Sequence, residues 1–470
     1  MSLAARFPSS FRFGAATAAY QIEGAVDVDG RGRSIWDTHS HAPGRITGGD
    51  TGDVACDHYH RMEQDVALMT ELGLDAYRFS VAWPRIIPDG DGEVEPRGLD
   101  FYRRLVAELD AAGIEPIVTL YHWDLPQALQ DRGGWANRAT VDAFVRYAEV
   151  VQDALGDRAR TFATFNEPWC SAFLGYADGE HAPGLTDPRA SLRAAHHLLV
   201  AHGAAVRAMR RAAGEHHDLG IVLNLIPMVA ASQDPVDVAA AWKVDGLQNR
   251  LFLDGILRGE LPSDVRALFE RFGAADAVLP DDGALVAQPI DLLGVNYYNR
   301  QHVAAQPSTP TVATAFPGCE DVAFLPPPEP TTAMGWGIEP HGLTEMLARV
   351  QREYGAPPMA VCENGAAFDD RPGPSGEVDD PERTSFIDVH LGAIADAIDE
   401  GVDVRAYYVW SLLDNFEWAH GFGRRFGIVA VDYDTQVRTI KSSGRWYRDL
   451  IAAHRDRRSV PAPVTETSGA

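Results

Sequence analysis

The segment Thr161-Phe-Ala-Thr-Phe-Asn-Glu167 is a short run of β-branched and aromatic residues that ends in an amide and a carboxyl group. A second run, Pro358 to Glu363, ends in a similar way, because Glu363 is followed by Asn364 and Gly365. Runs of this length and composition are typical of strands that are buried on both faces of a parallel sheet. We therefore expect two strands, far apart in the sequence, that each carry one glutamate at the C-terminal end.

Six further runs of the same kind bring the number of predicted strands to eight. Amphipathic stretches lie between them, for example 100–112, 140–155 and 386–400. This alternation predicts a parallel sheet that closes into a (β/α)8 TIM barrel with elaborated βα loops. No linker divides the chain, so we expect one catalytic domain over residues 1–454 and a poorly ordered polar tail over 455–470. The predicted strands are Phe11–Thr17, Ala76–Trp83, Ile114–Trp123, Thr161–Glu167, Leu219–Pro227, Ile290–Tyr298, Pro358–Glu363 and Val404–Asn415.

The composition of the chain indicates which kinds of partner and which cellular location to expect. Of the 470 residues 46% are hydrophobic, which supports a large core. The formal net charge of −26 would repel nucleic acid and anionic membranes, so neither is an expected partner. The sequence has no apolar stretch long enough for a membrane span and no apolar segment typical of a secretory signal. Its four cysteines have no CxxC spacing, and the expected location is therefore the reducing cytoplasm.

Polar and aromatic side chains stand at the end of nearly every predicted strand. Active sites of (β/α)8 barrels are built at this edge, from the loops that follow the strands. Indole rings can lie against the C–H groups of a sugar, while amides, carboxylates and imidazoles bond its hydroxyls. The pattern predicts a sugar pocket, although any one tryptophan could instead fill the core or the rim. The residues are Arg78, Trp83, His122, Trp123, Asn166, Glu167, Asn224, Asn296, Tyr298, Glu363 and Trp410.

Two glutamates in this set predict the chemistry. Hydrolysis of a glycosidic bond needs one protonated carboxyl group to release the leaving oxygen and one ionised carboxylate to attack the anomeric carbon. A single glutamate would more simply be a strand-end carboxylate that fixes a loop. The pair formed by Glu167 and Glu363 favours a glycosidase.

A series of motifs runs in order through nearly the whole chain. The motifs are Phe11-Arg-Phe-Gly-Ala-Ala-Thr-Ala-Ala-Tyr-Gln-Ile-Glu-Gly24, Asp57-His-Tyr-His-Arg61, Tyr77-Arg-Phe-Ser-Val-Ala-Trp-Pro-Arg85, Leu120-Tyr-His-Trp-Asp-Leu-Pro126, Thr164-Phe-Asn-Glu-Pro-Trp169, His181-Ala-Pro-Gly184, Gly294-Val-Asn-Tyr-Tyr298, Glu363-Asn-Gly365, Trp410-Ser-Leu-Leu-Asp-Asn-Phe-Glu-Trp418 and Arg425-Phe-Gly-Ile-Val429. Together they closely resemble glycoside hydrolase family 1, the β-glucosidase family.

The resemblance implies a role for each residue of the pocket. Glu363 matches the nucleophile and Glu167 matches the acid/base. We expect Arg78 and Tyr298 to keep Glu363 ionised with a low pKa, and the charge of Glu363 to raise the pKa of Glu167. Retention of configuration predicts carboxyl groups roughly 5–5.5 Å apart. The implied substrate-binding residues are Gln21, Arg78, His122, Trp123, Asn166, Asn296, Tyr298, Trp336, Trp410, Glu417, Trp418 and Phe426, with Asn166 on the sugar 2-hydroxyl and Trp410 beneath the ring.

Glu417 indicates the kind of sugar. Family members that act on 6-phosphosugars depart from the pattern at this position, because a carboxylate there would repel the phosphate. The presence of Glu417 therefore favours an unmodified hexose as the substrate. The alternative is that Glu417 is a solvent-exposed charge on a loop and has no role in binding.

The mouth of the pocket is less determined by the motifs. Trp336 resembles a tryptophan of the aglycone site, and Trp169, Phe173, Leu174 and Phe426 are expected at the entrance. The Pro-rich stretch from Gln301 to Thr332 has no clear periodicity, so we expect a long loop that shapes the subsite for the leaving group.

Three other interpretations need weighing. Cys362 departs from the family's usual residue before the nucleophile; it is expected to be a packing variant, and the alternative is a cysteine nucleophile. The sixteen histidines raise the alternative of a metal hydrolase, but no HExxH motif is present. A sugar-binding barrel without catalysis would be expected to lack one of the two glutamates.

The sequence thus predicts a retaining β-glucosidase that acts by double displacement on terminal non-reducing β-D-glucosyl residues. Its expected partners are short oligosaccharides such as cellobiose or aryl β-glucosides, with side activity on β-galactosides and β-fucosides. No cofactor or metal is expected, and the formation of a homo-oligomer stays open.

Overall fold

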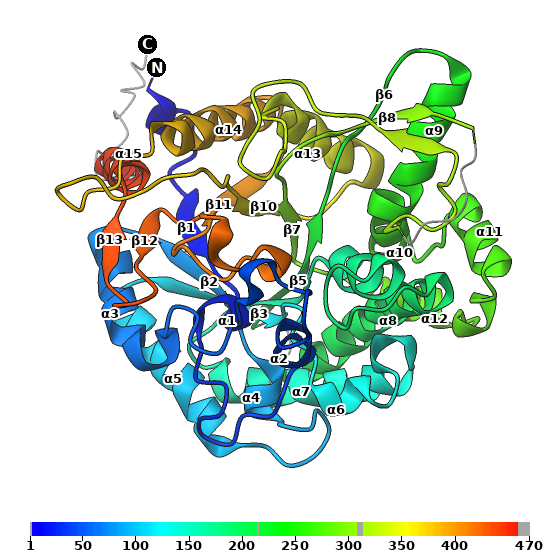
Figure 1. The fold of residues 1–470 in the computed structure, drawn as a ribbon, viewed down its shortest axis with the longest axis horizontal. Coiled ribbons are helices and arrows are strands. Elements are labelled where there is room, and N and C mark those ends of the chain that lie inside the picture. Colours follow the sequence, from blue (N-terminus) through cyan, green and yellow to red (C-terminus); the bar gives the residue numbers. More distant parts are fainter. Residues whose placement is uncertain (1, 214–215, 308–313, 459–470) are drawn as a thin grey trace, which may run out of the picture.

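Eight parallel strands form a closed barrel at the centre of the molecule, and helices surround it (Figure 1). The computed structural model describes residues 2–213, 216–307 and 314–458. The strand order around the barrel is β1-β11-β10-β7-β5-β4-β3-β2, which confirms the predicted fold class. The barrel strands are β1 (Arg12–Ala16), β2 (Ala76–Ser80), β3 (Glu115–Tyr121), β4 (Thr161–Asn166), β5 (Asp218–Asn224), β7 (Leu292–Asn296), β10 (Met359–Asn364) and β11 (Val404–Trp410).

Each predicted apolar run overlaps one barrel strand, but most strands end before the run does, while β10 ends one residue after it. The strand β3 stops at Tyr121 rather than Trp123, and β11 stops at Trp410 rather than Asn415. Ladder pairing ends there because the backbone leaves the barrel to form loops, while the apolar composition continues into the pocket. The last residues of these runs therefore belong to the site and not to the sheet.

The helices bury one apolar face against the barrel. In α7 the buried residues Phe144, Tyr147, Ala148 and Val151 recur at three- and four-residue spacing, as the sequence predicts. The helices are α1 (Ala19–Ile22), α2 (Ile35–Ser40), α3 (His58–Glu71), α4 (Trp83–Ile86), α5 (Pro96–Ala111), α6 (Gln127–Gln130), α7 (Ala139–Leu155), α8 (Pro188–Ala213), α9 (Pro235–Asp245), α10 (Leu251–Arg258), α11 (Ser263–Arg271), α12 (Asp282–Val286), α13 (His341–Tyr354), α14 (Pro381–Asp399) and α15 (Ser442–Arg458).

The long segment after β7 is not simply a loop, and the prediction for Gln301 to Thr332 is wrong in this respect. It contains β8 (Gln301–Ala305) and β9 (Val322–Phe324), which pair antiparallel with each other. Together with β6 (Met228–Ala230) they form a small three-stranded sheet beside α9 (Figure 1). These strands are only partly buried, so no apolar run marks them in this Pro-rich segment. A second small sheet joins β12 (Val429–Val431) to β13 (Arg438–Ile440).

The C-terminal segment also differs from the prediction at its start. Helix α15 continues to Arg458, although the polar tail was expected from Arg455. Arg455 bonds the carboxylate of Asp75 at 3.0 Å, and Arg457 bonds the carbonyl of Ala4 at 2.9 Å. The remaining residues of the predicted tail, 459–470, lie outside the described residues. Among the described helices, none is long and apolar enough to cross a membrane.

Candidate active site

A cavity of about 350 Å³ opens at the C-terminal ends of the barrel strands. Eleven of the fourteen predicted site residues line it, namely His122, Trp123, Glu167, Asn296, Tyr298, Trp336, Glu363, Trp410, Glu417, Trp418 and Phe426. The other three, Gln21, Arg78 and Asn166, are fully buried and bond residues of this set. The structure therefore brings all fourteen residues together around one cavity.

Glu363 lies near the end of β10 and is held by two donors. Arg78 donates from Nη1 to Oε1 at 2.7 Å, and the hydroxyl of Tyr298 donates to Oε2 at 2.7 Å. Burial raises the pKa of Glu363 above its ordinary value, while the charge and hydrogen bonds of Arg78 and the bond from Tyr298 oppose that rise. The two expected donors are present, but the expected low pKa is not, because the carboxyl group is removed from water.

The backbone after Glu363 explains the glycine in its motif. A Cβ atom on Gly365 would lie 1.7 Å from the carbonyl oxygen of Trp410, which no side chain could tolerate. This close approach packs the end of β10 against the end of β11. The glycine therefore permits Glu363 and Trp410 to face the same cavity.

Glu167 directly follows β4 and has a different environment. Its backbone φ is +46°, a left-handed conformation that is uncommon for residues other than glycine and that often marks functional sites. Asn296 donates from Nδ2 to Oε1 at 2.7 Å, and Cys170 donates from Sγ to Oε2 at 3.1 Å. Burial, together with the charge of Glu363, raises the pKa of Glu167 to about 8. At neutral pH this carboxyl group therefore carries a proton.

Hydrogen bonds beneath the cavity connect the two glutamates. Arg78 donates from Nη2 to Asn166 Oδ1 at 2.7 Å, and Asn296 donates from Nδ2 to the same oxygen at 3.0 Å. Asn166 Nδ2 lies 3.0 Å from His122 Nε2. Burial and the charge of Arg78 hold the pKa of His122 well below its usual range, so its ring is neutral. The network fixes Asn166 and Asn296 with their amides in defined orientations.

Glu417 is buried rather than solvated. Gln21 donates from Nε2 to its Oε2 at 3.3 Å, and the same amide bonds Asn415 Oδ1 at 3.0 Å. Burial and the charge of Glu363 raise the pKa of Glu417 to about 8. The cavity thus holds a third carboxyl group, and burial disfavours the ionised form of this group. A hydroxyl group of a bound ligand would form a hydrogen bond with it and so offset the cost of its burial.

Several buried polar atoms around the cavity have no hydrogen-bond partner among the described residues. Such atoms are rare in folded proteins and are commonly satisfied by water or a ligand. Here they are Gln21 Oε1, His122 Nδ1, Trp169 Nε1, His181 Nδ1 and Asn296 Oδ1. A polyhydroxylated ligand would supply both the donors and the acceptors that these atoms need.

Aromatic rings enclose the remaining walls. The ring of Trp410 is stacked on His122 with centroids 5.8 Å apart, and Trp123 packs on Trp418 at 4.6 Å. Trp336 lies 5.3 Å from Tyr298. These rings offer apolar faces beside the carboxyl groups, as a sugar-binding cavity requires.

The predictions for the entrance hold only in part. Trp169, Leu174, Trp336 and Phe426 line the cavity, but Phe173 is fully buried behind Trp169 and is not a lining residue. Trp83, expected at the pocket, begins α4 and stacks on Tyr147 in the core. The motif patterns placed His181 in a motif and Asn224 at a strand end without giving them a role. The motifs also assigned no role to several other residues that line the cavity and come from the segments after the barrel strands, namely Cys170, Glu180, Ile226, Asn299, Gln301, Met334 and His420.

The alternative chemistries find little support. Burial raises the pKa of Cys362 to about 11, so its thiol stays protonated and is a poor nucleophile. Within the described ranges, no group of three or more His, Cys, Asp or Glu side chains is arranged to hold a metal ion.

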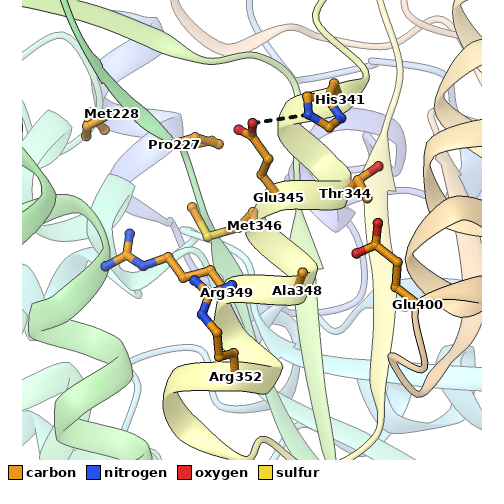
Figure 2. Close-up of a pocket in the computed structure, with 10 residues that line it drawn as sticks. All are labelled: Pro227, Met228, His341, Thr344, Glu345, Met346, Ala348, Arg349, Arg352 and Glu400. Carbon is orange, nitrogen blue, oxygen red and sulfur yellow. Dashed lines mark ion pairs between the residues drawn. The ribbon is translucent and has the colours of Figure 1, made fainter. Parts of the chain in front are cut away.

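A second hollow, of about 460 Å³, lies along α13 and is lined by none of the predicted site residues (Figure 2). Its charged side chains are largely paired: His341 lies 3.2 Å from Glu345, and Arg349 lies 2.6 Å from Asp245. It contains neither of the two candidate glutamates and offers no catalytic arrangement.

The barrel and its pair of buried glutamates define the class of glycoside hydrolases. The chain belongs to glycosyl hydrolase family 1, whose family model matches residues 3–456. A thermostable β-glucosidase B of Thermobispora bispora is 50% identical over 95% of this chain and 90% of its own. A bifunctional β-D-glucosidase/β-D-fucosidase of Bifidobacterium breve is 47% identical over 95% of this chain and 98% of its own. The crystal structure of a psychrophilic β-glucosidase from Micrococcus antarcticus superposes with a TM-score of 0.92, at 50% identity, and covers 97% of this chain and 100% of its own.

Proposed function

We propose that this enzyme hydrolyses short β-D-glucosides by double displacement, with Glu363 as the nucleophile and Glu167 as the acid/base. The observation that carries the proposal is the contrast between the two buried carboxyl groups. Glu363 is bonded by a cation and a phenol, both of which favour its ionised form, whereas Glu167 pairs with no cation among the described residues and its pKa is raised to about 8. This is the division of protonation that a retaining mechanism needs.

The proposed reaction begins when Glu363 attacks the anomeric carbon and Glu167 gives its proton to the leaving oxygen. A covalent glycosyl-enzyme then forms, and the negative charge of Glu363 is consumed. Because that charge helps to raise the pKa of Glu167, the pKa of Glu167 falls at this stage. Glu167 can then take a proton from the incoming water, which releases the sugar with its original configuration.

The proposed substrate is a terminal β-D-glucosyl group on a short oligosaccharide or on an aryl group. Gln21, Asn166, Asn296 and Glu417 would bond its hydroxyls, supported by the unpartnered Gln21 Oε1 and Asn296 Oδ1. His122 and Trp418 would complete this set, with Trp410 under the ring. Trp336 and Phe426 would contact the leaving group. Activity on β-fucosides is proposed as a side activity, because one relative is named for both reactions.

A panel of 4-nitrophenyl glycosides tests this proposal. The β-D-glucoside should be hydrolysed efficiently, the β-D-fucoside and β-D-galactoside should be hydrolysed at rates that fix the preference, and the α-D-glucoside should be inert. Proton NMR should show β-glucose as the first product, before mutarotation. Release of α-glucose first would contradict the retaining mechanism, and loss of activity in EDTA would favour the metal-hydrolase alternative.

A further inference from the structure

Cys170 is a direct neighbour of Glu167, and its single side-chain polar atom, Sγ, can both donate and accept a hydrogen bond. It stands three residues after Glu167, at the start of a π-helix, Cys170–Asp178, and its backbone N–H donates to the Glu167 carbonyl at 3.0 Å. Its side chain is buried, lines the cavity, and places Sγ 3.1 Å from Glu167 Oε2.

The orientation of Asn296 determines which oxygen of Glu167 can hold the proton. Arg78 can only donate, so the Asn166 atom that it contacts must be an oxygen. Asn296 contacts that same oxygen and must therefore present its amide nitrogen, which also donates to Glu167 Oε1. An amide nitrogen cannot accept a proton from a carboxyl group. The acidic proton of Glu167 therefore belongs on Oε2, the oxygen that faces Cys170.

The partner of Oε2 must then suit two protonation states. When Glu167 is ionised, Oε2 needs a donor; when it is protonated, a fixed donor would oppose the O–H group. A thiol is a weak donor and a weak acceptor and can meet both conditions. Asn224 donates from Nδ2 to Sγ at 3.5 Å, so the sulfur accepts from Asn224 while its own hydrogen is left for Oε2.

We propose that Cys170 is a positioning residue for Glu167. Its thiol donates a hydrogen bond to the Glu167 carboxylate when that group acts as a base. When Glu167 is protonated and acts as an acid, the thiol either accepts a hydrogen bond from the carboxyl O–H group or makes no hydrogen bond to it. This inference rests on the proposed role of Glu167. Burial and the neighbouring carboxyl groups hold the pKa of Cys170 well above its usual range, so the group remains a thiol rather than a thiolate. The other titratable groups that act on Glu167 or Cys170 are Arg78, Glu180, Tyr298, Glu363 and Glu417.

The pH dependence of kcat/KM on 4-nitrophenyl β-D-glucoside tests the proposal. Cys170→Ala removes the donor to the ionised carboxylate, so the apparent pKa of the basic limb should rise by about half a unit to one unit. Cys170→Ser keeps a side chain that can donate and accept a hydrogen bond. The apparent pKa of its basic limb should therefore stay within about 0.3 units of the wild-type value. The matched control is Cys56→Ala, because Cys56 is also a buried thiol, bonded at 3.1 Å to the carbonyl of Asp414, outside the cavity; its limb should not move.

A spectroscopic readout needs no alanine variant. The S–H stretching band of Cys170, assigned by its loss in Cys170→Ser, should shift as Glu167 titrates in the wild-type enzyme, since the thiol changes its hydrogen-bond role. The inference would be overturned if the S–H stretching frequency stayed constant while Glu167 titrates. It would also be overturned if the apparent pKa of the basic limb were the same in Cys170→Ala as in the wild type. Either result in an enzyme that hydrolyses the glucoside leaves the proposed function intact, whereas a wild-type enzyme without glucosidase activity would refute the proposed function itself.

Discussion

Glu167 and Glu363 face the same cavity, but different groups bond them. Glu363 has Arg78 and Tyr298 as donors, while Glu167 has an amide and a thiol. Because the two carboxyl groups are coupled, their protons leave in steps that belong to the pair. The first proton is removed most easily from the group beside the cation, which is Glu363. The environments therefore favour ionisation of Glu363 before Glu167, which is the order that their proposed roles require.

This arrangement predicts a bell-shaped dependence of kcat/KM on pH. The proposed acid must be protonated, and since its pKa is raised to about 8, activity should fall as the pH rises through about 8. The proposed nucleophile must be ionised, and because burial raises its pKa, the acidic limb should lie above the ordinary range of a glutamate. Initial rates measured under kcat/KM conditions from pH 4 to pH 10 check this profile, and a basic limb below pH 6 would contradict it.

Glu417 supports a second prediction at the scale of a residue. Replacing it by serine removes a buried carboxyl group that Gln21 supports and that the sugar hydroxyls are proposed to contact. A hydrogen bond contributes about 0.5–3 kcal/mol, depending on whether the carboxyl group is neutral or charged, so kcat/KM for the glucoside should fall about two- to a hundredfold. The activity of the variant on a 6-phosphoglucoside should increase at the same time, because the carboxyl group that would repel the phosphate is gone. Equal kinetics of the variant and the wild type on both substrates would show that Glu417 does not face the sugar.

The residue types of the site could be predicted from the sequence, but their environments could not. The motifs indicated Glu167, Glu363 and Glu417 because each stands in a recognisable sequence pattern. The raised pKa of Glu363 and the thiol beside Glu167 depend on burial and on side-chain direction, which a motif does not encode. Trp83 shows the reverse error, since its place after a strand resembled a site position although the ring packs in the core.

At the scale of elements, a buried ionic network ties the segments after β10 and β11 to α14 and α15. Arg383 is fully buried and pairs with Asp380 and with Asp370, the latter at 2.8 Å. Lys441 lies 2.5 Å from Asp370 and 2.7 Å from Asp414. Because β10 carries Glu363 and β11 ends at Trp410, this network holds the supports of the site together.

Asp380→Ala should therefore destabilise the protein strongly. Removing a carboxylate from a buried ionic network typically costs about 3–5 kcal/mol, and here it leaves Arg383 to share Asp370 with Lys441. The carboxylate of Asp380 also accepts hydrogen bonds from Ser442 and Ser443, which are lost as well. Urea denaturation followed by tryptophan fluorescence measures the effect.

The matched control is Asp100→Ala, which removes an exposed pair with Arg103 and should change the free energy of unfolding by less than about 1 kcal/mol. Equal effects of the two substitutions would contradict the importance of the buried network.

Secondary structure was predictable where burial leaves a clear pattern in the sequence. The eight barrel strands are buried on both faces and helices such as α7 on one face, so they satisfy that condition. The strands β8 and β9 were missed, since they are only partly buried and are held mainly by pairing within the small sheet that they form with β6. Their position depends on tertiary contacts that no local pattern shows.

At the scale of the whole molecule, barrel closure is what makes one site from distant residues. Arg78 on β2 and Glu363 on β10 are 285 positions apart in the sequence, yet they bond across the barrel. Closure also places the end of β4, with Glu167, across from the end of β10. The fold thus brings two glutamates from distant strands to one cavity, and we propose that Glu363 is the nucleophile and Glu167 the acid/base.

The configuration of azide adducts tests that claim most directly. In Glu363→Ala, azide occupying the vacated space should attack once and give the α-glucosyl azide. In Glu167→Ala, an activated aryl glucoside should still form the glycosyl-enzyme, and azide should attack that intermediate to give the β-glucosyl azide through two inversions. NMR of the two products decides the matter: α from Glu363→Ala and β from Glu167→Ala is the predicted result, and the reverse assignment would contradict the proposed roles.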